Sequence, residues 1–216
     1  MATLQASAHA TSTNRNLTKG AFTWKFYAFY AFKVYTNSPE LHLLTSRIRL
    51  ENPMSAPPFD VSKADRWFAV ELNNKTWDWL EAGDYSQPNA ERMVYAAHAC
   101  CHHWFQVGGP ENHARGECLV ANSHAAVGES DSALRHARRC LELTSEHRDA
   151  LADWDVAFTY DALARAHAAA GDKEATAKAC SQAQEAAEEI ADNGDKEFFE
   201  KWHAAGNWHG LSKLIV

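Results

Sequence analysis

The stretch that decides the fold runs from residue 113 to residue 191, where one helix-pair pattern occurs twice. In the first copy, Ser-His124-Ala-Ala-Val-Gly128-Glu-Ser-Asp-Ser-Ala-Leu joins two helical patterns. In the second copy, two helical patterns are joined in the same way by Ala-His167-Ala-Ala-Ala-Gly171-Asp-Lys-Glu-Ala. Each copy has a helix of small residues that ends in His-x-x-x-Gly, then an acidic turn, then an alanine-rich helix. The repetition predicts a helical repeat protein whose helix pairs stack on one another.

Further helices are predicted on both sides of this stretch, because apolar residues recur there at spacings of three and four. Ser62 is the expected N-cap of a helix that ends before Gly83, and Ser86 is that of a helix that ends before Gly108. The repeat itself supplies helices at about 111–127, 132–144, 150–170 and 173–190. A short helix at 196–205 is expected to cap the open end. The predicted fold of residues 54–216 is therefore all-α: antiparallel helix pairs in a short, degenerate solenoid with a C-terminal capping helix.

Composition narrows the class of partner. The chain has 216 residues, a hydrophobic content of 46% and a net charge of −7. Such a chain forms a folded domain, and an acidic body without a basic stripe argues against a nucleic-acid partner. No run of about 18 apolar residues occurs, so no membrane partner is expected. The five cysteines include no Cys-x-x-Cys pair, which indicates reduced thiols packed as small apolar groups and a cytoplasmic protein.

Residues 1–53 differ from the rest of the chain. They contain six Lys or Arg against two Asp or Glu, and their first 20 residues lack any periodicity. An aromatic run at 21–35 fits a signal peptide or a membrane anchor poorly, because lysines interrupt it and a weak cleavage site follows. We interpret residues 1–53 as a disordered or non-native extension, with translation beginning at Met54; an export or anchoring segment is the alternative.

Both copies of the pattern resemble the tetratricopeptide repeat. The positions that match its bulky, small and turn residues are Val120, Ala121, His124, Gly128, Ala133, Ala137 and Cys140 in the first copy, and Tyr160, Leu163, Ala164, His167, Gly171, Ala179 and Ala183 in the second. The match is degenerate, since Glu117 replaces the consensus aromatic residue and the turn glycines lie 43 residues apart rather than about 34. A longer string between residues 103 and 167 also resembles a group of small bacterial helical proteins of no assigned function.

The resemblance implies a function and a site. In tetratricopeptide-repeat proteins the first helix of each pair lines a concave groove that binds a protein or peptide partner. Carried onto this chain, the groove residues are Arg115, Cys118, Asn122, Phe158, Asp161 and Arg165. Arg115, Asn122 and Arg165 can receive a carboxylate through charge-assisted hydrogen bonds. Alternatively, these groups are solvated or paired within the chain, for example Arg165 with Asp161 at i,i+4.

A non-enzymatic interaction module, which binds a partner or self-associates without a cofactor, is therefore the favoured function. The rival is a metal-binding helical enzyme. His98 and His102 are four residues apart on one predicted helix and can supply two ligands, with His124, His136 or Asp155 as further ones. No His-Glu-x-x-His motif, nucleophile elbow or phosphate loop occurs. On the repeat, His124 and His167 occupy the bulky position before the turn, which indicates packing residues.

Overall fold

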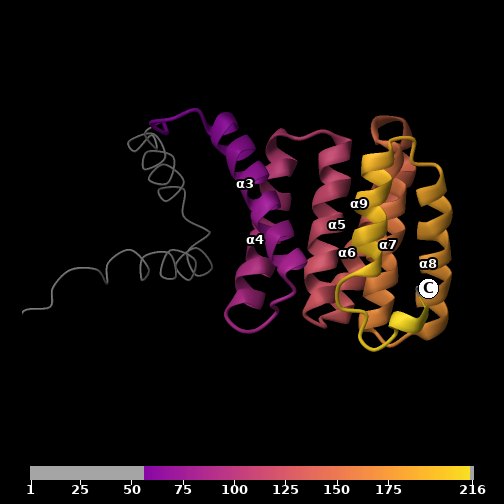
Figure 1. Ribbon diagram of the computed structural model, residues 1–216. Coiled ribbons are helices and arrows are strands. Elements are labelled where there is room, and N and C mark those ends of the chain that lie inside the picture. Colours follow the sequence, from indigo (N-terminus) through magenta and orange to yellow (C-terminus); the bar gives the residue numbers. More distant parts are fainter. Residues whose placement is uncertain (1–55, 215–216) are drawn as a thin grey trace, which may run out of the picture. The chain divides into compact units, whose positions relative to one another are not determined.

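The structure is a computed structural model that describes residues 56–214 of the chain. Residues 57–216 form one compact unit, which is described below. Within residues 56–214 every regular element is an α-helix or a short 3-10 helix (Figure 1). The predicted all-α fold is thus confirmed, whereas the predictions for residues 1–53 and Met54 lie outside the described residues.

Within the described residues, six long helices form three consecutive pairs, and a shorter seventh follows them. The pairs are α3 (Val61–Ala82) with α4 (Asn89–Val107), α5 (Pro110–Ala126) with α6 (Ser130–Glu146), and α7 (Asp153–Ala169) with α8 (Lys173–Glu188), followed by α9 (Asn193–Ala204). Short 3-10 helices lie at Arg148–Ala150 and Ser212–Leu214. Across the pairs, α5 contacts both α3 and α7, so the first helices of the three pairs form one row. None of the described helices is both long enough and apolar enough to cross a membrane.

The two copies of the sequence pattern form the same turn. Gly128 and Gly171 have φ values of 81° and 73°, in the left-handed region that glycine adopts without strain. The carbonyl of His124 accepts a hydrogen bond from the Glu129 N–H at 2.9 Å, and that of His167 accepts one from Asp172 at 3.1 Å. Together with the glycine N–H bonds to Ala125 and Ala168, these bonds form a Schellman motif in each copy. The turn predicted from His-x-x-x-Gly is therefore confirmed.

Small residues bring the helices close together. The core consists largely of alanine and cysteine side chains from α4 to α8, with Leu119, Val120 and Met93 among the larger members. A β-carbon at Gly116 of α5 would lie 3.1 Å from the Cys101 sulfur and 3.3 Å from its Cα, so the two helices approach closely at this glycine. All five cysteines are free and buried, as predicted.

The start of the first helix differs from the prediction. Asp60, not Ser62, is the N-cap of α3, and its carboxylate accepts a hydrogen bond from the Lys63 N–H at 3.1 Å. Asp65, three residues after Ser62, accepts a hydrogen bond from His103 Nδ1 of α4 at 2.7 Å. Asp65 therefore contacts the neighbouring helix and does not cap α3.

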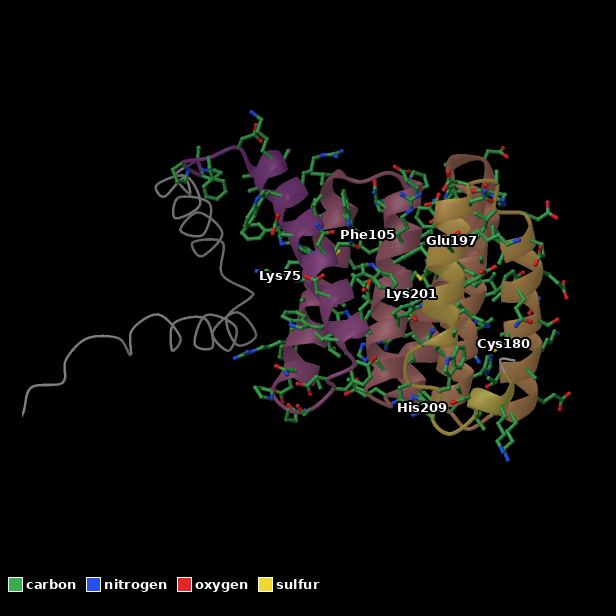
Figure 2. All side chains as sticks on the ribbon, in the orientation of Figure 1. Lys75, Phe105, Cys180, Glu197, Lys201 and His209 are labelled. Carbon is green, nitrogen blue, oxygen red and sulfur yellow. The ribbon has the colours of Figure 1, made fainter. Side chains whose placement is uncertain are left out.

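The last helix folds back over the row of first helices. α9 contacts α7 and α8, and its Trp202 meets Trp77 of α3 at 4.9 Å between ring centroids. Beyond α9, the chain turns back toward the end of α5, where His209 Nε2 donates to the Ala125 carbonyl at 2.8 Å (Figure 2). The capping helix thus covers part of the surface that the resemblance assigned to a partner.

Candidate functional site

An open cavity of about 440 Å³ lies among α3, α5, α7 and α9. Its walls are mostly aromatic or aliphatic and come from Trp77, Trp104, Leu151, Trp154, Phe158 and Phe198. Polar groups of Asn73, Asn112, Arg115 and Asp155 complete the lining, together with Glu81 and Asp195. Volume and lining match those of sites that bind a small ligand or an anchoring side chain.

Arg115 and Asp155 form the charged part of this cavity. The Arg115 Nε and Nη2 groups donate to the two carboxylate oxygens of Asp155, each at 2.8 Å. The guanidinium lies 4.4 Å from the ring centroid of Trp154. Asp155 also accepts the Ala152 N–H at 2.9 Å and thereby caps α7. The ion pair therefore fixes α7 against α5, and it neutralises the positive charge that a carboxylate ligand would need.

The six groove residues predicted from the resemblance divide among three environments. Arg115, Cys118 and Phe158 line the cavity. Asn122 is buried on α5, where its amide donates to the Cys118 carbonyl at 3.0 Å. The other two residues of the set, Asp161 and Arg165, are buried beneath α9. Their role in partner binding stays a prediction, and of the three groups expected to receive a carboxylate, Arg115 is the one that lines the cavity.

Asp161 and Arg165 belong to a buried cluster that we call the tail lock, which comprises Asp161, Arg165, Trp202, His203 and Trp208. Arg165 Nε donates to Asp161 at 2.6 Å, and its Nη2 donates to the Trp202 carbonyl at 2.7 Å. Its guanidinium lies between two indole rings, 4.4 Å from each centroid. Asp161 also accepts bonds from Trp202 Nε1 and His203 Nδ1, at 2.8 and 2.6 Å. The pairing that the sequence offered as the alternative is thus present.

The charge of Asp161 is set by this cluster. Burial alone would raise the pKa of the carboxyl, since desolvation penalises the anion. The Arg165 guanidinium and the hydrogen-bonded His203 ring outweigh burial and hold the pKa of Asp161 below its usual value. Asp161 is therefore an anion at neutral pH, and it joins the end of the chain to α7.

A second polar cluster, the histidine cluster, joins three other helices. One ring nitrogen each from His98 of α4, His124 of α5 and His136 of α6 lie within 4.8 Å of one another. The Nε2 atoms of His98 and His124 are 2.8 Å apart. His124 Nδ1 donates to Glu129 and His136 Nδ1 to Glu117, each at 2.6 Å. Both ring orientations are therefore fixed by carboxylates.

Two of these rings are neutral at physiological pH. Burial lowers the pKa of His98 and of His124, and the neighbouring rings and Arg135 lower both further. The hydrogen bond to Glu129 acts in the opposite direction on His124 without reversing the shift. Neutral imidazole is the form that donates an electron pair to a metal ion.

His102, predicted as the companion of His98, lies elsewhere. Its side chain is exposed, and its ring contacts His103 at 5.5 Å between centroids. Asp155, another expected ligand, binds Arg115 instead. Sequence spacing therefore predicts one member of the cluster, His98, and offers His124 and His136 only as further ligands. Glu117 and Glu129 were missed, although a glutamate at the consensus aromatic position of a small-residue helix was a usable signal.

Comparisons of the chain with known protein families, with curated proteins and with solved structures found no match. The functional conclusions below therefore depend on the geometry of these clusters and of the cavity.

Proposed function

We propose that the protein is a non-enzymatic, cytoplasmic interaction module that binds a peptide segment of a partner through the cavity. The observation that carries the proposal is the open, aromatic-lined cavity of about 440 Å³ on the row of first helices. The resemblance of both copies to the tetratricopeptide repeat, whose groove lies on the same helices, supports it. The five reduced, buried cysteines are typical of a cytoplasmic protein.

The lining favours an apolar side chain with a basic neighbour over a carboxylate. Arg115 is engaged by Asp155 through two hydrogen bonds, so its charge is already balanced. Glu81 and Asp195 also line the cavity, and their carboxylates form no ion pair within the described part of the chain. A large aromatic or aliphatic side chain would bury apolar area against the tryptophans. A neighbouring Lys or Arg of the peptide would meet the two carboxylates.

A random peptide library displayed on phage and selected on the full chain tests this function. Peptides with a bulky apolar residue beside Lys or Arg are expected to be enriched. Phe198 lines the cavity and is 48% exposed, whereas Tyr95 on α4 is 70% exposed and does not line it. Phe198→Glu should abolish the enrichment, because it places a charge in the apolar wall, and Tyr95→Glu should not. No enrichment, or enrichment that survives Phe198→Glu, would exclude the cavity as the peptide site.

Self-association is the second candidate, and one exposed aromatic pair favours it. Trp67 and Phe68 of α3 are 58% and 43% exposed, and their rings are in edge contact at 4.9 Å. Phe68 also stacks on His103 at 5.3 Å. Exposed apolar groups of this size are common at interfaces between proteins. Light scattering of the full chain tests the candidate: a dimer that becomes a monomer on Trp67→Glu supports it, and a monomeric parent chain excludes it.

A further inference from the structure

The three rings of the histidine cluster come from three consecutive helices and converge on one point. Their ring centroids are 5.0, 5.3 and 5.8 Å apart, and the nitrogens are within 4.8 Å of one another. We propose that His98, His124 and His136 bind a divalent transition-metal ion, with zinc as the expected ion. The bound ion would link α4, α5 and α6. None of the three lines the cavity, so this site is independent of the peptide function.

The hydrogen bonds present the right atoms to a metal. Each Nδ1–H of His124 and His136 is donated to a glutamate, which leaves the Nε2 atom of the same ring unprotonated. These two electron pairs now accept hydrogen bonds from His98 Nε2 and from Arg135, and a metal ion would replace both bonds, with the His98 proton moved to Nδ1. A carboxylate behind a ligating histidine fixes the tautomer, orients the ring and raises its basicity. Glu117 is itself 7% exposed, and a buried carboxylate is costly unless it has such a partner. Two rings of the three are thus already held as in known zinc sites.

The distances require only a small adjustment. Tetrahedral zinc with Zn–N bonds of about 2.0–2.1 Å needs ligand nitrogens about 3.4 Å apart. The Nε2 atoms of His98 and His124, now 2.8 Å apart, would separate slightly, and the widest pair would close from at most 4.8 Å. The more accessible His98 and His136 rings would make this adjustment by rotation, while the buried His124 would stay in place. Three histidines leave a fourth position for water.

The charges and the ligand type select the ion. Imidazole suits zinc, copper, nickel and iron(II), whereas calcium and magnesium prefer oxygen ligands. Glu117 and Glu129 supply two negative charges directly behind the ligands, which balance a divalent cation. Arg135 opposes binding, because its Nη2 donates to His136 Nε2 at 3.2 Å. Since Arg135 is exposed, its side chain can swing into solvent when the ion binds.

Titration calorimetry of the full chain tests the site. The protein is purified without a histidine tag, stripped with EDTA and titrated with ZnCl2, and Co²⁺ absorption in the visible range reports tetrahedral geometry. His98→Gln is expected to lose at least the 10–100-fold in affinity that follows loss of a supporting group behind a ligand. His102→Gln is the matched control, since it removes an exposed histidine four residues away, and it should bind zinc unchanged. Equal affinity of His98→Gln and the parent chain, or no zinc binding by the parent chain, would overturn the proposal.

A variant that should bind zinc more tightly distinguishes loss of the site from unfolding of the protein. Arg135→Ala removes both a competitor for His136 Nε2 and a positive charge, so zinc should bind more tightly and should raise the melting temperature further than in the parent chain. Because Arg135 is exposed, the substitution leaves the core intact. Zinc binding that is unchanged or weaker in Arg135→Ala would place the metal away from His136 and would refute the assignment.

Discussion

Arg165 shows how a single side chain joins the end of the protein to its repeat. Its guanidinium is bonded to Asp161 and to the backbone of the α9 end, and it is stacked between Trp202 and Trp208. The Arg165 and Asp161 side chains are only 5% and 0% exposed. Removal of one partner of such a pair leaves a buried, uncompensated charge. Arg165 is therefore expected to stabilise the fold rather than to meet a ligand.

Arg165→Ala should lower the free energy of unfolding by about 3–5 kcal/mol, the loss seen when a buried ion pair loses one partner. Arg115→Ala is the matched control, because it also removes an arginine paired with a buried aspartate. Its side chain is 35% exposed, and Asp155 keeps the Ala152 N–H, so the loss should be smaller. Urea denaturation followed by circular dichroism measures both. Equal losses would contradict the difference in burial.

Asp161 makes the free energy of unfolding depend on pH in the acidic range. Its folded pKa is lowered below 3.8 by Arg165 and His203, while an unfolded aspartate titrates near 3.9. A lowered folded pKa contributes stability that is fully present above the unfolded pKa and is lost as pH falls through the folded pKa. The buried titratable or charged groups around Asp161 are Arg165, His203, Cys118 and Cys180.

The unfolding free energies of the parent chain and of Asp161→Asn should therefore converge as pH falls from about 5 toward 3. Asparagine cannot ionise, so the variant lacks this acid-sensitive component at every pH. Urea titrations at several pH values provide the measurement, with Asp60→Asn as an exposed control. A gap that is constant across this range would mean that Asp161 does not carry the charge in the folded state.

The two turns at Gly128 and Gly171 are held together by hydrogen bonds between residues at most five positions apart. A β-carbon at Gly171 would have no other atom within 4 Å, so a substitution there changes the backbone energy and not the packing. The φ of 73° is costly for a residue with a side chain. Asparagine tolerates the left-handed region better than alanine does.

Gly171→Ala should consequently lower the free energy of unfolding by about 1–2 kcal/mol. Gly171→Asn should lower it less, because asparagine adopts positive φ more readily although its side chain is larger. Thermal and urea unfolding of the two variants distinguish backbone strain from packing. A larger loss for Asn than for Ala would indicate a steric clash instead.

α9 covers part of the surface that the first helices of the three pairs form. It brings Trp202 to Trp77 of α3 and Phe198 to Phe158 of α7, and so it covers part of the row of first helices with the chain's own residues. The remaining part is the cavity, which α9 also closes on one side. A helix expected only to shield the end of the stack therefore also shapes the candidate site.

At the scale of the whole described domain, the buried cysteines contribute small apolar side chains to the core. Burial raises the pKa of Cys100 and of Cys101 to about 12, and that of Cys180 to about 11. A thiol of this kind stays protonated at neutral pH, and the thiolate is the reactive form. The five thiols are spread over α4, α5, α6 and α8, so their reactivity reports on the packing of all three pairs.

In the native protein at pH 8, all five cysteines should react with a disulfide reagent at least about 100-fold more slowly than in urea, since burial blocks access to every thiol. For Cys100, Cys101 and Cys180 the raised pKa suppresses attack further. Absorbance of the released thiolate follows the reaction. Rapid labelling of any one cysteine in native buffer, located by mass spectrometry, would show that its helix opens independently of the rest.

The success of the sequence-based predictions depended on how local each feature is. The helix pairs and their turns followed from spacing, because His-x-x-x-Gly encodes a helix end whose hydrogen bonds span six residues. The site was predicted only in part. Arg115, Cys118 and Phe158 line the cavity, but the positions of Trp77 and Phe198 opposite them depend on how α3 and α9 pack.

The sequence by itself determined the all-α class, the helix pairs and the left-handed turn glycines, because periodicity and backbone sterics act within a few residues. Only the tertiary structure decided which polar groups meet. Arg165 with the α9 end and His98 with His124 and His136 are separated by 26 or more residues, and no local rule relates them. The physical reason is that a buried polar group must find a partner wherever packing provides one. The His-x-x-x-Gly pattern ends a helix in both copies. In the first copy, its histidine, His124, also contacts His98 and His136 of neighbouring helices.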